Sequence, residues 1–179
     1  MKTEQNIHNN IKTSFRKIPP KDIAFRAWRK EDIPAIAEMC IQLYHYIDRI
    51  DPVWRTSPWA KDHLRTHLYD LYNKSQAMTY VACKDRELIG FITGTIVRRS
   101  PVILPSRDGL VDNAYIKTSW RNKGIGTRLV QMLLDWFRSQ GINEVRVYYQ
   151  ISNSRAAAFW ERVGFKPWTM QSHIWLDRQ

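Results

Sequence analysis

The stretch that decides the fold is Trp120-Arg121-Asn122-Lys123-Gly124-Ile125-Gly126-Thr127, which has the spacing R-x-x-G-x-G. Downstream, apolar side chains recur at helical spacing and charged ones lie opposite them, which predicts a helix over residues 127–140 with Gly141 as its stop. A helix N-terminus offers unpaired N–H groups and the positive end of the helix dipole, and glycine lets the backbone approach an anion closely. We therefore interpret the turn as a pyrophosphate cradle.

The spacing argues against two other phosphate-binding patterns. A nucleotide hydrolase loop needs Lys directly after its second Gly, whereas Thr127 follows Gly126. A dinucleotide fingerprint needs a third Gly where Leu129 stands, and the nearest acid at a suitable range, Glu144, opens a predicted strand instead of ending one. R-x-x-G-x-G remains, although that string alone also fits a tight strand-to-helix turn with a basic surface.

The surroundings of the turn resemble the GNAT superfamily of N-acetyltransferases, which hold the pyrophosphate of acetyl-CoA at this place. The family pattern continues as strand, helix, strand, and then N-x-x-A-x-x-F-Y-x-x-x-G-F. This chain has an apolar strand at 111–116 before the turn, a strand at 145–149, and then Asn153-Ser154-Arg155-Ala156-Ala157-Ala158-Phe159-Trp160-Glu161-Arg162-Val163-Gly164-Phe165. The specific resemblance covers residues 110–165, with looser agreement from Ile23 onward.

The resemblance implies an α/β fold in one N-acetyltransferase domain, residues 22–179, after a flexible basic extension, residues 1–21. The implied sheet is mixed, mostly antiparallel and twisted, with six to seven strands that splay apart between the fourth and the fifth, and about four helices flank it. Hydrophobic periodicity and turn residues predict a strand at 23–28, helices at 32–47 and 59–73, strands at 78–84 and 87–98, and a loop at 99–108. A chain of 179 residues suits one compact domain.

Composition limits the classes of protein that remain. The chain carries a net charge of +11, which we interpret mainly as solvated surface, with an anionic or RNA-associated substrate as the alternative. The tryptophans do not alternate with basic residues, which disfavours a nucleic-acid partner. Two cysteines without ligand spacing argue against a disulfide scaffold and a metal site, and no apolar run suggests a signal peptide or a membrane span. We expect a cytoplasmic protein, for which a homodimer is one expected state.

By this resemblance, the reaction is direct attack of a neutral amine on the thioester of acetyl-CoA. Backbone groups of Ala114, Tyr115 and Ile116 are expected to bond the cofactor, and the Ile116 N–H is the expected oxyanion donor. Arg121 either pairs near the phosphates or forms a surface ion pair. The remaining residues of the implied cofactor set are Asn122, Lys123, Gly124, Ile125, Gly126, Thr127, Asn153, Phe159 and Trp160.

One departure from the family pattern bears on mechanism. Much of the family has a Tyr after the Phe of the last helix, and this Tyr protonates the CoA thiolate; here Trp160 stands there, and its indole N–H is too weak an acid. Either Tyr148, Tyr149 or Ser154 supplies the proton, or water suffices because a thiol with a pKa near ~8.5 is a fair leaving group. The alternative for each tyrosine is that it donates no proton and only packs its ring at the strand edge.

Asp112 is the candidate general base. It aligns with an acidic position that polyamine N-acetyltransferases of this family carry on the same strand. The alternative to a catalytic role is that Asp112 is simply a solvated or ion-paired carboxylate. The ribosomal-protein N-terminal acetyltransferases have a Glu where Tyr148 stands here and use the Tyr that Trp160 replaces. Both departures count against that particular activity.

Acceptor recognition is expected from the first two helices, their loop and the loop at 99–108. Tyr44, Tyr46 and Trp54, with Trp59 nearby, are candidates for an aromatic mouth around a cation or a flat ring, although Tyr44 also fits the buried stripe of its helix. His45, and His173 near an expected last strand, are weaker catalytic candidates. The predicted function is acetylation of a primary amine of a small molecule. The alternatives are acetylation of a protein N-terminus or lysine, and a non-catalytic acyl-CoA-binding sensor.

Overall fold

The computed structural model describes residues 18–176, so the expected extension at 1–21 lies almost wholly outside the described residues. The elements are β1 (Ile23–Ala27), the 3-10 turn η1 (Lys30–Asp32), α2 (Ile33–Ile50), α3 (Ala60–Tyr72), β2 (Ala77–Lys84), β3 (Glu87–Arg98), β4 (Arg107–Ile116), the 3-10 turn η2 (Thr118–Trp120), α4 (Ile125–Ser139), β5 (Val145–Val147) and α5 (Ser154–Arg162). The predicted strand at 87–98 is β3 itself, and the other predicted boundaries are met within a few residues.

The strands form one sheet in the order β1-β2-β3-β4-β5. Neighbours from β1 to β4 are antiparallel, and β5 alone runs parallel to its neighbour β4, which confirms a mixed, mostly antiparallel sheet. The expectation of six to seven strands was wrong for the described part of the chain, which has five. Residues 166–176 are extended but join no ladder there, because an alternating sequence makes a strand only where it finds an edge to pair with.

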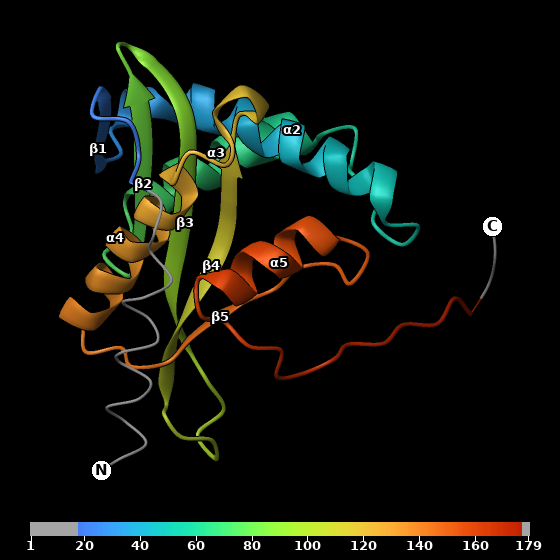
Figure 1. Ribbon diagram of the computed structural model, residues 1–179. Helices are drawn as coiled ribbons and strands as arrows, with labels where there is room; N and C mark the ends of the chain where they lie inside the picture. Colours follow the sequence, from blue (N-terminus) through green and yellow to red (C-terminus); the bar gives the residue numbers. More distant parts are fainter. Residues whose placement is uncertain (1–17, 177–179) are drawn as a thin grey trace.

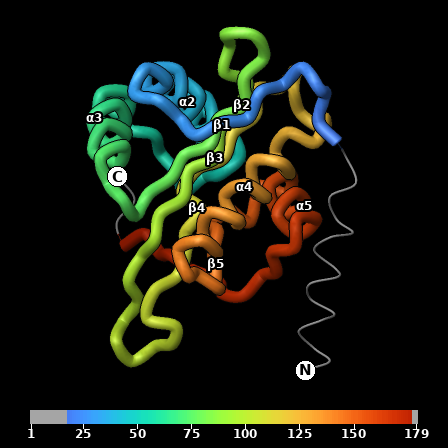
Figure 2. The backbone as a smooth tube through the Cα atoms, turned by 90° about the vertical axis from the view of Figure 1, so that its left-hand side faces the viewer, coloured from blue at the N-terminus to red at the C-terminus, as the bar shows by residue number. Residues whose placement is uncertain are grey.

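Two helices cover each face of the sheet (Figures 1 and 2). One core lies under α2 and α3 and includes Val81 and Phe91, while the other lies under α4 and α5 and includes Ala82 and Ile92. Adjacent strand residues point to opposite faces, so each strand serves both cores. The sheet is therefore buried on both sides.

The apolar stripe of α2 is buried at Ile33, Ile36, Ala37, Cys40 and Ile47. Leu43 and Tyr44, which share the stripe, are only half-buried. Cys40 and Cys83 are free thiols in the core. No helix among residues 18–176 has the length and apolar character needed to cross a membrane.

The hairpin between β3 and β4 contains a buried cluster of charges. Asp108 is fully buried, and its Oδ2 lies 3.2 Å from Arg99 Nε and 2.6 Å from Arg146 Nε. The shorter contact is an ion pair whose angles do not meet those of a hydrogen bond, while Arg146 Nη2 donates to Asp108 Oδ1 at 3.0 Å. The Arg99 side chain is nearly buried, because Asp108 and Glu144 pair with it.

Candidate active site

The sheet opens between β4 and β5. Their parallel pairing runs only from Gly109↔Val145 to Val111↔Val147, while β4 continues to Ile116 beside β3. Between these two strands, the described chain therefore leaves one edge of the second half of β4 unpaired. This is the splay that the resemblance to the family implied.

The alternation of hydrogen-bonded and non-bonded residue pairs between β3 and β4 shows which backbone groups of β4 face the splay. Lys117 N donates to Ile89 O at 2.9 Å, and the pairing then runs through Ile116↔Gly90 to Ala114↔Ile92. Bonded and non-bonded pairs alternate along an antiparallel ladder, so Ile116 and Ala114 fall in non-bonded pairs and turn their N–H and C=O groups away from β3. Arg121 Nε donates to the Ile116 carbonyl at 2.9 Å, as expected for a group that points into the splay.

The turn after β4 presents a free helix N-terminus to the same opening. Asn122 and Gly124 have positive φ angles of 61° and 80°, which bend the chain sharply into α4. The bond of Arg128 N to Gly124 O, 3.0 Å, opens the helical ladder, so the N–H groups of Ile125, Gly126 and Thr127 lack a carbonyl one turn earlier. Gly124, the residue at the N-cap, has no side chain with which to cap this end. These donors and the helix dipole together favour an anion.

A cavity of about 600 Å³ joins the splay to this helix end. Apolar and aromatic side chains line most of it, with polar groups at the turn, which is the usual character of a small-molecule site. It brings together all of the sequence-predicted cofactor residues except Lys123: Ala114, Tyr115, Ile116, Arg121, Asn122, Gly124, Ile125, Gly126, Thr127, Asn153, Phe159 and Trp160. Lys123 lies outside, with its ammonium 4.7 Å from the centre of the Trp120 ring.

Helix α5 forms the far wall of this cavity. Asn153 caps the helix, since its Oδ1 accepts from Ala156 N at 3.1 Å, and the residue is buried. Trp160 is buried and packs edge to face between Phe159 and Phe165, at centroid distances of 5.0 and 5.3 Å. The indole therefore acts as a packed wall at the position where much of the family has a hydroxyl.

The three candidate proton donors do not line the cavity. Tyr148 is 61% exposed, and its hydroxyl accepts from Arg146 Nη1 at 2.8 Å. Tyr149 is half-buried against the core under α4 and α5, which forms the cavity floor. Ser154 is exposed at the first residue of α5.

Asp112 sits at an irregularity of the sheet. The register shifts so that Thr93 faces Asn113 and Gly94 faces Val111, which leaves Asp112 as an extra, bulged residue of β4. Its Oδ1 accepts from Thr95 Oγ1 at 3.2 Å. Asp112 is exposed, yet the surrounding protein displaces water from its carboxylate, and this desolvation raises the pKa of Asp112 from 3.8 to about 6.

The predicted aromatic mouth divides into two parts. The rings of Tyr44 and Trp54 lie 5.6 Å apart, and Tyr44 Oη donates to Asn113 Oδ1 at 3.3 Å, next to Asp112. Burial raises the pKa of Tyr44 to about 12. Tyr46 instead lines the cavity, with Arg155 stacked 5.7 Å from its ring centre.

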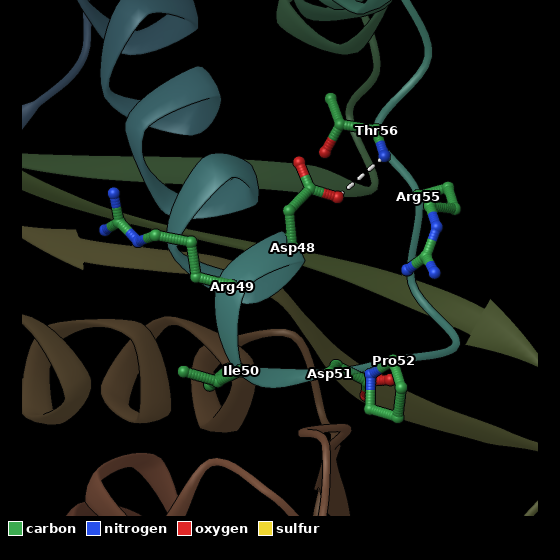
Figure 3. A pocket seen from close by; sticks show the side chains of 7 residues that line it. All are labelled: Asp48, Arg49, Ile50, Asp51, Pro52, Arg55 and Thr56. Carbon is green, nitrogen blue, oxygen red and sulfur yellow. Dashed lines mark hydrogen bonds between the residues drawn. The ribbon is translucent and has the colours of Figure 1, made fainter.

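The loop that carries Trp54 is held by two carboxylates. Asp48 accepts from Thr56 N at 2.8 Å, the bond drawn in Figure 3, and Asp51 accepts from Val53 N at 2.8 Å. Both carboxylate residues also line a second, open hollow.

Three further candidates lie away from the cavity. His45 and Trp59 are exposed, and His173 contacts Trp175 in the C-terminal segment. Sequence reasoning missed Leu43 and Arg155, which line the cavity, and Thr95, which holds Asp112. No motif marks these positions, because only the folded register brings them to the site. No cluster of three or more potential metal-ligating side chains occurs in residues 18–176.

The chain matches the acetyltransferase (GNAT) family over residues 42–165, and it belongs to this family. One curated relative is N-alpha-acetyltransferase 30 of Schizosaccharomyces pombe, which is 33% identical over 57 residues, 32% of this chain. The match spans only 38% of that protein.

Solved structures share the fold at low identity. Aminoglycoside N-acetyltransferase AAC(6')-Iy in complex with CoA has a TM-score of 0.68 at 15% identity, over 88% of this chain and 95% of that one. A predicted acetyltransferase of Clostridium acetobutylicum with acetyl-CoA also has a TM-score of 0.68 at 14% identity, over 88% and 96%. A variant of the BH1408 protein of Bacillus halodurans reaches 0.76 at 13% identity, over 86% and 99%.

We expect Gly126→Val to weaken acetyl-CoA binding at least ~10-fold, because the new side chain would crowd the backbone donors of the cradle. A Cβ at this position would lie 3.2 Å from the Phe159 ring, which itself lines the cavity, so the substitution also presses on the opposite wall. Isothermal titration calorimetry measures the effect. Unchanged affinity in a folded Gly126→Val protein would refute the cradle.

A matched pair of glycines separates binding from stability. Gly124 and Gly141 both have positive φ, 80° and 72°, so replacement by Ala should destabilise each variant by roughly 1–2 kcal/mol. Gly141 ends α4 away from the cavity, with nothing within 4 Å of a new Cβ. Only Gly124→Ala should therefore lose acetyl-CoA affinity, and equal losses in both variants would show a purely global effect.

Proposed function

We propose that the protein is an acetyl-CoA-dependent N-acetyltransferase that acetylates a primary amine of a small molecule. The proposal rests chiefly on one cavity in which the outward-facing backbone of Ala114 and Ile116 meets the N-terminus of α4. The family match and the structural neighbours with CoA or acetyl-CoA bound support it.

The two ends of the cavity suit the two ends of the cosubstrate. The N–H groups of Ile125, Gly126 and Thr127 would receive the pyrophosphate, since a helix N-terminus binds anions well. The backbone of Ala114 and Ile116 would bond the amide-bearing arm in the manner of a missing strand. Arg121 holds the Ile116 carbonyl and stacks 5.4 Å from the Tyr115 ring centre, so we assign it to positioning the turn.

In the proposed reaction the amine nitrogen forms a bond to the acetyl carbon, and the carbon–sulfur bond breaks. The Ile116 N–H stabilises the oxyanion that develops on the carbonyl. Asp112, through a water, removes the proton that the amine must lose, and a pKa of about 6 leaves its carboxylate ionised yet basic near neutral pH. The leaving thiolate takes its proton from Tyr149 or from water.

The structure constrains the class of acceptor less than it constrains the binding of acetyl-CoA. A small molecule suits the tilted rings of Tyr44 and Trp54 beside Asp112, and aminoglycoside acetyltransferases are among the structural neighbours. The second candidate, acetylation of a protein N-terminus or lysine, is favoured by the similarity to N-alpha-acetyltransferase 30. A non-catalytic acyl-CoA sensor is the third, because Trp160 fills the place of the usual acid.

Two measurements discriminate among these functions. Calorimetry with acetyl-CoA tests binding, and a thiol-release assay with small amines, peptides and protein lysines tests turnover. Binding with turnover on small amines supports the proposal, and turnover on peptides alone would move it to the second candidate. Binding without turnover would favour the sensor, and absence of binding would overturn enzyme and sensor together.

We further propose the cytoplasm as the compartment, since two buried free thiols suit a reducing environment, and a homodimer as the assembly. The net charge of +11 is assigned to solvated surface and to the rim of a polyanionic cosubstrate.

The proton donor has its own test. We expect Tyr149→Phe to lower kcat at least ~10-fold, to keep acetyl-CoA affinity, and to lose the fall in rate at high pH that an essential acid produces. Tyr148→Phe is the matched control and should stay near wild type, because Arg146 already engages that hydroxyl and the ring is exposed.

If both Tyr149→Phe and Tyr148→Phe keep the wild-type rate, water is the group that protonates the leaving thiolate. Trp160→Tyr should then raise kcat by restoring a hydroxyl at the place that the family uses. Its smaller ring would leave part of the packed wall empty, which lowers stability.

A further inference from the structure

The charged side chains that line the cavity all have the same sign. They are Arg121, Arg155 and Arg162, and none of the described residues around the cavity is a carboxylate. Arg121 is already engaged, because it donates to a backbone carbonyl of β4 at 2.9 Å. Arg155 and Arg162 are exposed, and neither forms an ion pair with any group of residues 18–176. At the wall of a binding cavity such unpaired guanidinium groups are available to an anionic ligand.

The two unpaired arginines lie at different ends of one helix face. Arg155, Phe159 and Arg162 stand at positions i, i+4 and i+7 of α5. A Cβ on Gly126 would meet the Phe159 ring at 3.2 Å, so this ring lies against the N-terminus of α4. The Arg162 guanidinium lies 5.7 Å from the centre of the same ring, which places it at the proposed pyrophosphate end. Arg155 stands about 10 Å away along the helix axis.

Arg155 instead faces α2. Its guanidinium lies 5.7 Å from the centre of the Tyr46 ring, and both side chains line the cavity. Tyr46 follows two residues after Tyr44, whose hydroxyl donates to Asn113 beside Asp112. Two residues span only about 3 Å along a helix axis. Arg155 therefore contacts the same stretch of α2 that reaches the candidate general base.

We propose that Arg155 binds an anionic group of the acceptor, a carboxylate or a phosphate, so that the acceptor is a primary amine that also carries a negative charge. This inference rests on the proposed function. The guanidinium offers a planar fork of N–H donors that matches both anions, and the Tyr46 ring holds that plane at the cavity wall. The amine then approaches Asp112 while Arg155 holds the anion. A polycationic acceptor would meet like charge in the same cavity, which disfavours amines of the aminoglycoside type.

Pairs of acceptors that differ only in the anionic group test the inference. Two such pairs are para-aminomethylbenzoate with its amide, and phosphoethanolamine with ethanolamine, each assayed by thiol release with acetyl-CoA. We expect the wild type to favour the anionic member of the better pair at least ~10-fold in kcat/KM, the usual effect of a hydrogen bond to a charged group. Equal use of both members, or turnover confined to neutral and cationic amines, would overturn the inference.

Three variants locate the preference. Arg155→Gln should lower kcat/KM for the anionic member at least ~10-fold more than for its neutral counterpart. Arg155→Lys should keep part of the preference, because it retains the charge but loses the fork. The matched control is Arg138→Gln, which removes one positive charge on the exposed side of α4, where Arg138 pairs with Asp135. A preference that survives in Arg155→Gln would contradict the assignment.

Calorimetry with acetyl-CoA separates the two sources of an anion. Arg162→Gln should weaken acetyl-CoA binding more than Arg155→Gln does, because Arg162 lies at the pyrophosphate end. The reverse order, with an unchanged acceptor preference, would assign Arg155 to a phosphate of the cosubstrate and overturn the inference. Acetyl-CoA binding without turnover of any amine would contradict the proposed function itself. The two failures differ because turnover persists when only the acceptor class is wrong.

Discussion

Asp108→Ala should destabilise the protein by about 3–5 kcal/mol, because it leaves two guanidinium groups without their buried carboxylate. Arg99 and Arg146 lie 3.2 and 2.6 Å from Asp108, and the carboxylate has no contact with solvent. The cluster ties the β3–β4 hairpin to β5 just before the strands separate. Urea denaturation measures the loss as a lower midpoint at unchanged slope.

Asp135→Ala is the matched control for the effect of burial. Asp135 pairs with Arg138 at 2.7 Å on the exposed side of α4, where an ion pair contributes only about 0–1 kcal/mol. Equal losses in both variants would contradict the assignment of Asp108 as an anchor. A larger loss of stability for Asp108→Ala than for Asp135→Ala would support that assignment. Arg146, released from Asp108, would also be free to leave the Tyr148 hydroxyl to which it donates.

Much of the fold could be predicted because its signals are local. Alternation and turn residues place β3 at Glu87–Arg98, and the glycine-rich turn places the start of α4 within two residues. Resemblance to the family then supplied the splay and the cofactor residues. Because the splay and the turn face one cavity, most of those residues line that cavity, as the resemblance implied.

What could not be predicted depends on pairing between distant segments. The bulge that exposes Asp112 arises from the register of β4 against β3, and nothing within either strand's own sequence specifies it. Arg99 stands in a basic pair in the sequence, yet it is buried because Asp108 and Glu144 meet it in space. The expected last strand does not form for the same reason. Residues 166–176 have a strand-like pattern, but a strand also needs an edge to pair with, and the local pattern does not specify that edge.

The bulge at Asp112 leads to the largest expected change in activity. Asp112→Asn should lower kcat/KM by ~10²–10⁴-fold at neutral pH, the usual contribution of a general base. Acetyl-CoA affinity should not change, because Asp112 does not line the cavity. In the wild type the rate should rise with pH through about 6, since a protonated carboxyl cannot accept a proton, and this rise should vanish in the variant.

Thr95→Val tests the same assignment without removing the carboxylate. The hydrogen bond from Thr95 lowers the pKa of Asp112 and so opposes the effect of burial. Its loss should therefore raise that pKa and move the rise in kcat/KM to higher pH, while the plateau stays nearly constant. An acid limb that does not move in Thr95→Val, or one that survives in Asp112→Asn, would assign the titration to another group and leave Asp112 as a solvated strand carboxylate.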